Sequence, residues 1–173
     1  MAAARWVLLL VLLCGGYGAV SEQKAEAGNA KAAPATVRFE GFSVRMTYSP
    51  QAMKTLTVRK ETVIAAAYLY GFPKPGTPRR YIDHEGKMDM DSFQVESMPG
   101  QDAIFKEIEL KKADLERTDE RGPQLLINVF SGRKSSPDNL LDCGIYEGPL
   151  KAVADQAIDI SCKLIGESDA TGH

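Results

Sequence analysis

The sequence of 173 residues contains few of the side chains on which catalytic sites depend, with two histidines, three cysteines and one tryptophan. So little histidine leaves few candidates for the base that activates a serine or cysteine nucleophile. The sequence G-x-S-x-G, which marks the nucleophile of α/β-hydrolases, is absent as well. We therefore expect a protein that is not an enzyme and that uses no cofactor.

Two further features are missing: a long apolar run and an excess of basic charge. The first apolar run, residues 6–13, is far shorter than the about twenty residues that cross a membrane as a helix. With 21 basic and 23 acidic residues the net charge is −2, and the chain lacks the positive field that holds nucleic acid. We expect neither a transmembrane span nor a nucleic-acid partner.

The start of the sequence has the pattern of a secretory signal peptide. Arg5 supplies a positive charge, residues 6–13 form the apolar segment, and small residues follow up to Ser21. We predict that residues 1–21 are removed, with cleavage after Ser21 or, alternatively, after Gly18. The protein is then periplasmic or secreted, and the lack of an N-x-[ST] glycosylation site is compatible with a bacterial periplasm.

Cys14 allows a second interpretation, in which a bacterial lipoprotein signal leaves a lipidated cysteine as the new N-terminus. That signal requires a small residue before the cysteine, whereas Leu13 is large. A lipid anchor at Cys14 is therefore the less favoured alternative. Residues 22–36 contain no leucine, isoleucine, valine or aromatic side chain, which predicts a flexible leader, and residues 167–173 are predicted to be a disordered tail.

Removal of Cys14 with the signal leaves two cysteines, Cys143 and Cys162. In an oxidising compartment an even number of cysteines indicates disulfide bonding, and only one pairing exists here. A redox-active pair is usually spaced as C-x-x-C. The wide spacing therefore favours a structural disulfide.

Apolar and polar residues alternate in several segments, which is the pattern of β-strands with one buried face. The predicted strands are residues 37–48 with a bend near Gly41, a continuation through Leu56 and Val58, and residues 63–70, 125–130 and 157–165. Segment 63–70 is a continuous apolar run, and we expect it to be a central strand with little exposure. Segment 125–130, which is apolar except for Asn128, predicts a second buried strand.

The residues Asp83 to Gly86 suit a tight turn and predict a β-hairpin. Its strands would be Tyr81-Ile82 and residues 88–95. Residues 103–110 fit either a strand or one face of a helix, and the sequence leaves this choice open.

The clear capping signals from which we predict helices lie near the C-terminus. Ser136 followed by Pro137 predicts a short helix that ends at Gly144, because serine caps helices and proline suits their first turn. Gly148-Pro149 predicts a second short helix that continues through Ala154.

About seven strands separated by turns, with little helix, predict a mainly β fold. We expect a single β-sandwich of immunoglobulin-like or transthyretin-like kind over residues 37–166. The strand, D-x-x-G turn, strand arrangement around Asp83 is similar to the pattern of transthyretin-like modules. That resemblance implies the fold alone and carries no functional residue.

Two loops are candidate recognition sites. Residues 71–81 combine prolines with aromatic and basic side chains in a stiff loop, which would lose little entropy on binding. Its candidate contact residues are Phe72, Lys74, Arg79, Arg80 and Tyr81. Residues 131–139 contribute Arg133 and Lys134. If both loops lie at the same end of the sandwich, they form one basic surface with aromatic anchors.

Residues 131–136 follow a predicted buried strand, as a phosphate-binding loop does, but they lack the sequence G-x-x-x-x-G-K-[ST]. Arg133, Lys134 and the backbone N–H groups of residues 136–138 remain candidates for holding an anion. The same segment resembles the Ser-Gly-x-Tyr loop of periplasmic lysozyme inhibitors, although the tyrosine is missing here. That resemblance implies a lysozyme-inhibitor-like protein as a minor alternative.

Four carboxylates around the predicted hairpin are weak candidates for a calcium site: Asp83, Glu85, Asp89 and Asp91. Ca²⁺ takes six to eight oxygen ligands, but the spacing does not match an EF-hand loop. Alternation places Asp89 and Asp91 on one solvated strand face. We expect a polar turn and no bound metal.

These observations together predict an exported, non-enzymatic binding or accessory module of the cell envelope. It would recognise a protein or an anionic envelope component through residues 71–81 and 131–139. The alternative is a secreted β-sandwich protein that binds a small molecule or calcium, and an envelope lipoprotein is a minor alternative.

Overall fold

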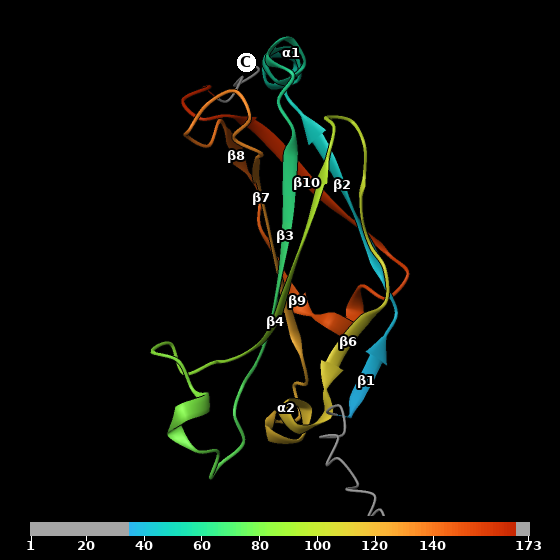
Figure 1. Cartoon of the computed structure of the whole chain (residues 1–173), viewed down its shortest axis with the longest axis vertical. Coiled ribbons are helices and arrows are strands. Elements are labelled where there is room, and N and C mark those ends of the chain that lie inside the picture. The colour runs from blue at the N-terminus through green and yellow to red at the C-terminus, as the bar shows by residue number, and fades with distance from the viewer. Residues whose placement is uncertain (1–34, 169–173) are drawn as a thin grey trace, which may run out of the picture. The chain divides into compact units, whose positions relative to one another are not determined.

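The computed structural model describes residues 35–168. The predicted signal peptide, Cys14 and most of the predicted leader and tail lie outside the described residues. The described residues form ten strands, two α-helices and two short 3₁₀ helices (Figure 1). Their order is β1 (Thr36–Phe39), β2 (Phe42–Tyr48), α1 (Pro50–Arg59), β3 (Val63–Gly71), η1 (Arg79–Tyr81), β4 (Met88–Ser97), β5 (Ala103–Phe105), β6 (Ile108–Lys111), α2 (Lys112–Arg117), β7 (Gln124–Ser131), β8 (Leu141–Cys143), β9 (Tyr146–Pro149), η2 (Leu150–Ala152) and β10 (Ala157–Leu164).

The described strands form three separate sheets. One four-stranded sheet has the order β5-β2-β10-β8, the other has the order β4-β3-β7-β9, and β1 pairs with β6. Neighbouring strands are antiparallel except β2 and β10, which are parallel. The prediction of a mainly β fold is confirmed, but about seven strands was too few. Five of the strands have only three or four residues, too short for alternation to reveal them.

Side chains from both four-stranded sheets contribute to one hydrophobic core. Its least exposed members include Val63 and Leu69 of β3, Ile127 of β7, Val44 of β2 and Ile160 of β10. Burial of each such side chain stabilises the fold by about 1.5–3 kcal/mol. β3 pairs with β4 along one edge and with β7 along the other, which confirms that segment 63–70 is a central strand. β7 contains the second predicted buried strand, and most of its side chains are buried.

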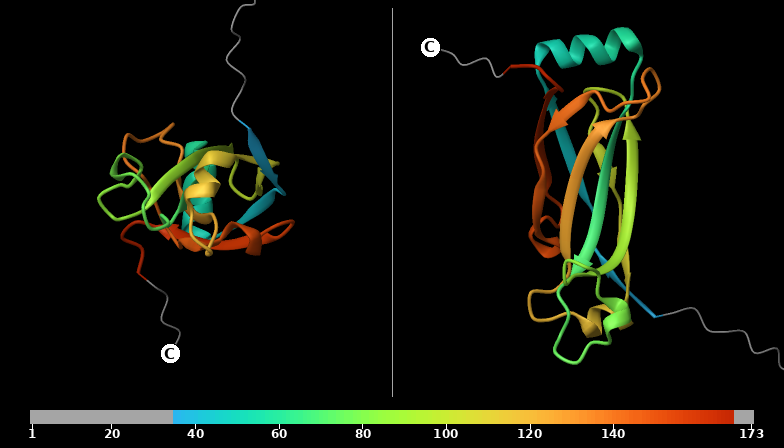
Figure 2. Two further views of the ribbon diagram at one scale, coloured as in Figure 1. Left: turned by 90° about the horizontal axis from the view of Figure 1, so that it is seen from below. Right: turned by 90° about the vertical axis from the view of Figure 1, so that its left-hand side faces the viewer.

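α1 occupies a segment for which Leu56 and Val58 had predicted a strand. Ser49 caps the helix, because its side chain accepts a hydrogen bond from the Ala52 N–H at 3.0 Å. Ala52 and Leu56 lie four residues apart and are both buried, whereas Val58 is 74% exposed. This burial at helical spacing outweighs the weak alternation. Figure 2 shows α1 lying across one end of the two four-stranded sheets.

The turn at Asp83 forms, but the predicted hairpin does not. Tyr81 belongs to η1, and β4 instead pairs with β3 from Gly71 opposite Met88 to Val63 opposite Ser97. The long apolar run of β3 is the better partner, because it pairs with β4 over nine residues, with one register shift between Leu69 and Tyr70. Residues 103–110 form the short strands β5 and β6.

The two helices predicted near the C-terminus have different outcomes. The segment from Ser136 to Gly144 forms no helix, and its last part is β8, antiparallel to β10. The segment after Gly148-Pro149 does contain a helical turn, η2, at Leu150–Ala152. The predicted C-terminal strand is confirmed as β10.

Candidate functional site

The loop of residues 71–81 is docked against the segment that follows α2. Pro73 forms an isolated bridge with Thr118. The Lys74 ammonium donates a hydrogen bond to the carbonyl oxygen of Glu116 at 2.8 Å. The loop is therefore fixed in place, and the charged end of Lys74 is used within the protein.

Both aromatic side chains of this loop are covered by the protein's own arginines. The Arg121 guanidinium lies 3.4 Å from the centroid of the Phe72 ring. Arg80 and Arg117 lie 4.7 Å and 4.1 Å from the centroid of the Tyr81 ring. A hydrogen bond from Arg80, together with the charges of Arg80 and Arg117, lowers the pKa of the Tyr81 hydroxyl. One face of each ring is therefore occupied by a guanidinium group of the protein itself.

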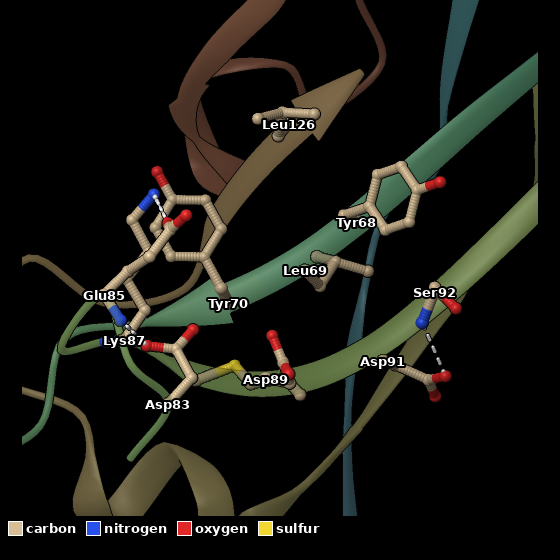
Figure 3. A pocket seen from close by; sticks show the side chains of 11 residues that line it. Tyr68, Leu69, Tyr70, Asp83, Glu85, Lys87, Asp89, Asp91, Ser92 and Leu126 are labelled. Carbon is tan, nitrogen blue, oxygen red and sulfur yellow. Dashed lines mark hydrogen bonds and ion pairs between the residues drawn. The ribbon is translucent and has the colours of Figure 1, made fainter. Parts of the chain in front are cut away.

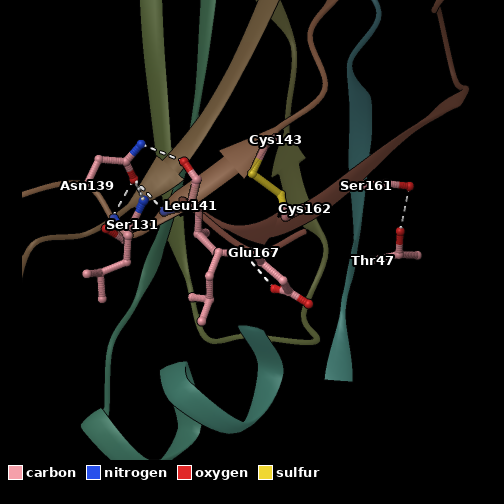
Figure 4. The surroundings of a disulfide bond; sticks show 10 residues. Thr47, Ser131, Asn139, Leu141, Cys143, Ser161, Cys162 and Glu167 are labelled. Carbon is pink, nitrogen blue, oxygen red and sulfur yellow. Dashed lines mark hydrogen bonds between the residues drawn. A yellow bond between two sulfur atoms is a disulfide. The ribbon is translucent and has the colours of Figure 1, made fainter. Parts of the chain in front are cut away.

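The loop of residues 131–139 is closed by the side chain of Asn139. Asn139 Oδ1 accepts hydrogen bonds from the N–H groups of Ser131 at 2.9 Å and Leu141 at 3.1 Å, and its amide nitrogen donates to the Leu141 carbonyl at 2.7 Å (Figure 4). These bonds fix a loop conformation after Ser136 and explain why no helix begins there.

The 131–139 loop binds an anion of the protein itself, the carboxylate of Glu61. Glu61 Oε1 accepts a hydrogen bond from Lys134 N–H at 2.8 Å, and Oε2 accepts from Ser135 N–H at 2.7 Å and the Ser135 hydroxyl at 2.5 Å. Burial raises the pKa of Glu61, but these hydrogen bonds outweigh it, and the net pKa is lowered. The backbone N–H groups that bind the anion are those of residues 134 and 135, whereas the sequence had suggested residues 136–138.

The two basic side chains of this loop have different surroundings. The Lys134 ammonium lies 3.0 Å from Glu96 Oε1, so its charge is neutralised within the protein. Arg133 is exposed and forms no ion pair with any other described residue. Of the two loop candidates, Arg133 alone is free to meet a partner.

The two predicted recognition loops lie at opposite ends of β3. In the antiparallel pairing of β3 with β7, Val63 lies opposite Ser131 and Tyr70 lies opposite Gln124. The 131–139 loop therefore leaves β7 beside the start of β3, whereas the 71–81 loop follows its end. A nine-residue strand spans about 27 Å. The two loops do not form the single basic surface considered above.

Arg133 lies instead beside the C-terminal end of α1. Lys60 caps α1 and immediately precedes Glu61, the residue that anchors the 131–139 loop. Lys54 and Arg59 of α1 are also exposed, and α1 contains no acidic residue. We call Lys54, Arg59, Lys60 and Arg133 the basic end. Among the described residues, none of the four forms an ion pair.

The α1 members of the basic end were not among the predicted site residues, because their segment was expected to form a strand. The signal that would have found them is Ser49 followed by Pro50, the same capping pattern that was noticed at Ser136. A capped helix with basic residues and no acidic residue is a recognisable positive surface.

Two residues of the basic end have left-handed backbone conformations. The φ angle is 52° at Lys60 and 59° at Arg133. A side chain in this region costs about 1–2 kcal/mol relative to the right-handed region, and glycine avoids that cost. The chain thus places exposed cations at two positions where glycine would be more stable.

The four candidate calcium ligands have other partners or remain apart. Asp83 Oδ1 accepts hydrogen bonds from the N–H groups of Glu85 and Lys87, both at 2.8 Å, and these bonds lower its pKa. Glu85 pairs with the Lys87 ammonium at 3.3 Å. Within residues 35–168, no group of three or more histidine, cysteine or acidic residues is arranged to hold a metal ion.

Cys143 and Cys162 form the predicted disulfide, between directly opposite residues of β8 and β10 (Figure 4). Their Cα atoms are 4.1 Å apart. An intramolecular disulfide is compatible with a periplasmic or extracellular protein. In the part of the chain that the structure describes, no helix is long and apolar enough to cross a membrane.

No protein family, no curated protein and no solved structure matches this chain. The functional proposals therefore rest on the chemistry of the described residues.

Proposed function

We propose that the protein is an exported, non-enzymatic recognition module of a cell envelope, folded as a single β-sandwich, that binds an anionic partner through the basic end. The observation that carries this proposal is the pair Lys60 and Arg133. Both are exposed cations without an acidic partner among the described residues, and both hold backbone conformations that favour glycine.

The cost of these two conformations supports a role for the side chains. Selection for stability alone favours glycine at the residue that follows a helix and in a left-handed loop position. Residues that depart from this preference concentrate at functional sites, where the strain is tolerated for the sake of binding. A charged side chain kept at such a position therefore supports recognition of an opposite charge.

The arrangement of the basic end supports an anionic partner with an extended surface. α1 presents Lys54 and the 74% exposed Val58 on the same helix, four residues apart. The loop that carries Arg133 is held rigidly by Glu61, so little entropy is lost when a partner binds. The whole chain carries a net charge of −2, so the positive surface is local and not a consequence of composition.

Two observations support the non-enzymatic part of the proposal. His84 is exposed in a turn, with 92% of its side chain accessible, and its Nε2 lies 4.0 Å from Glu85 Oε1. The disulfide withdraws both thiols of the described residues from nucleophilic chemistry. The resemblance to lysozyme inhibitors gains no support, because Ser131 is fully buried.

The proposal is tested by capture of a partner from a cell-envelope extract with the purified protein. The double variant Lys60→Ser/Arg133→Ser should lose the partner, and the captured component should be acidic. The double variant Arg79→Ser/Arg80→Ser, which removes the same charge from the opposite end of β3, is the matched control and should retain it. Equal capture by wild type and both variants would overturn the proposal.

A further inference from the structure

A cavity of about 470 Å³ opens on the outer face of the β4-β3-β7-β9 sheet, toward the end of β3 that is remote from the basic end (Figure 3). Its lining includes Tyr68 and Tyr70 of β3, Leu126 of β7, and Asp89 and Asp91 of β4. The pairing of β3 with β4 shifts between Leu69 and Tyr70, and a bulge of this kind changes the direction of side chains along a strand. Aromatic rings and carboxylates thus share one cavity.

One part of this cavity already holds a cation, supplied by the protein. The Lys87 ammonium lies 4.7 Å from the centroid of the Tyr70 ring, 3.3 Å from Glu85 Oε2 and 3.9 Å from Glu147 Oε1. Tyr70 donates a hydrogen bond to Glu147, and burial together with this carboxylate raises the pKa of Tyr70 to about 12. The site combines the two interactions that recognise an organic ammonium ion, a ring face and carboxylates.

The other part of the cavity, around Tyr68, also combines an aromatic ring with carboxylates. No basic side chain of the described residues forms an ion pair with these carboxylates. Tyr68 is 41% exposed, a large fraction for a tyrosine in the middle of a strand that has a neighbour on each side. Among residues 35–168, Asp91 accepts a hydrogen bond only from the N–H of Ser92, at 2.8 Å. Neither Asp89 nor Asp91 forms an ion pair with another described residue.

We propose that the Tyr68 side of this cavity binds a small organic ammonium ion, held against the tyrosine ring and neutralised by Asp89 and Asp91. A hard metal ion is a poorer fit, because no group of three ligating side chains gathers in the described residues. An anion would be repelled by both carboxylates. A neutral ligand would remove these carboxylates from water without pairing them, at a cost in free energy.

The probe is choline, a quaternary ammonium ion, titrated into the full purified protein and followed by NMR and calorimetry. Choline should perturb the signals of Tyr68 and Ser92, and added NaCl should weaken binding. Tyr68→Leu should lower the affinity about five- to tenfold, and Asp91→Asn should lower it severalfold. Tyr68→Phe keeps the ring and should bind as wild type. Asp102→Asn, outside the cavity, is the charge-matched control and should also leave the affinity unchanged.

Butylamine is the second probe. It carries the same charge as choline on a primary amine, so the two affinities show which kind of ammonium ion the cavity prefers. Both Tyr68 variants change an exposed ring and should fold, which thermal unfolding checks. The proposal is overturned if choline and butylamine leave the Tyr68 signals unchanged, if Tyr68→Leu binds them as wild type does, or if Ca²⁺ alone perturbs the cavity. Failure of this test leaves the basic end unaffected, because the two sites share no residue.

Discussion

Ser135 donates two hydrogen bonds to the carboxylate of Glu61, from its backbone N–H at 2.7 Å and from its hydroxyl at 2.5 Å. A third bond comes from the N–H of Lys134. Glu61 follows the end of α1, so this contact joins the helix to the 131–139 loop and sets the position of Arg133. The position of Arg133 in the basic end therefore depends on the buried carboxylate of Glu61.

We expect Glu61→Gln to lower the free energy of unfolding by about 2–4 kcal/mol, because an amide group placed against two backbone N–H donors loses charge-assisted hydrogen bonds in a buried site. Urea denaturation measures the effect. Glu107→Gln removes the same charge from an exposed position and should change stability by less than about 0.5 kcal/mol. A loss for Glu61→Gln as small as that of the control would show that the contact does not anchor the loop.

The same contact predicts a dependence of stability on pH. The folded state lowers the pKa of Glu61, so its stabilising effect is present above the pKa of the unfolded chain and is lost as pH falls through the folded value. As pH falls below the ordinary glutamate pKa of about 4.3, the difference in stability between wild type and Glu61→Gln should shrink, and it should vanish below the folded pKa. A constant difference between the two proteins at all acid pH values would contradict the assigned ionisation.

A second carboxylate should have the opposite pH dependence. A hydrogen bond with Asp155 and the charge of Asp155 raise the pKa of Glu40. Its stabilising contribution is therefore present below the unfolded pKa and is lost as pH rises through the folded value. Asp155→Asn removes the repulsion and keeps a residue that tolerates the φ angle of 53°. It should raise the melting temperature at pH 7 and reduce this pH dependence, and an unchanged profile would show that the two groups do not interact.

The left-handed residues of the basic end predict opposite effects on stability and binding. Lys60→Gly and Arg133→Gly should each raise the free energy of unfolding by about 0.5–1 kcal/mol, because glycine relieves the backbone cost. Both variants should bind an anionic partner less tightly than wild type. Asp155→Gly, a change at the third such position, should raise stability without affecting binding. Stabilised variants that bind as wild type does would mean that these side chains have no role in recognition.

The disulfide should contribute mainly to stability. Replacement of Cys143 and Cys162, which are 19 positions apart, by alanine removes a cross-link whose loop entropy corresponds to about 3 kcal/mol. Denaturation by urea under non-reducing conditions should show a loss of this size, with binding by the folded protein unchanged. Loss of binding in a variant that remains folded would assign the disulfide a functional role.

The capping signals show why part of the fold could be predicted and part could not. Ser49-Pro50 and Ser136-Pro137 look alike in the sequence. The first is followed by apolar residues at helical spacing that the core buries. The second is followed by Asn139, whose side chain bonds to Ser131 across the loop. The competing contact joins residues eight positions apart, which is beyond the reach of a helix cap, so capping signals alone could not decide between the two.

The strands at 63–70 and 125–130 were predictable because almost all of their side chains are apolar, and short apolar segments of this length form buried strands. The position of the loops was not, because it depends on which strands pair. β7 runs antiparallel to β3, which places residues 131–139 near Lys60 and far from Arg79. The sequence identified an anion-binding loop but could not reveal that Glu61 already supplies its anion.

The most direct test of the account is the affinity of the purified protein for inorganic polyphosphate, a linear polyanion, at several salt concentrations. We predict that wild type binds, that binding weakens steeply as salt rises, and that Lys60→Ser/Arg133→Ser binds at least about tenfold more weakly. Arg79→Ser/Arg80→Ser should remain within about twofold of wild type. Equal weakening in both double variants, or binding that does not depend on salt, would contradict a specific anionic site at the basic end.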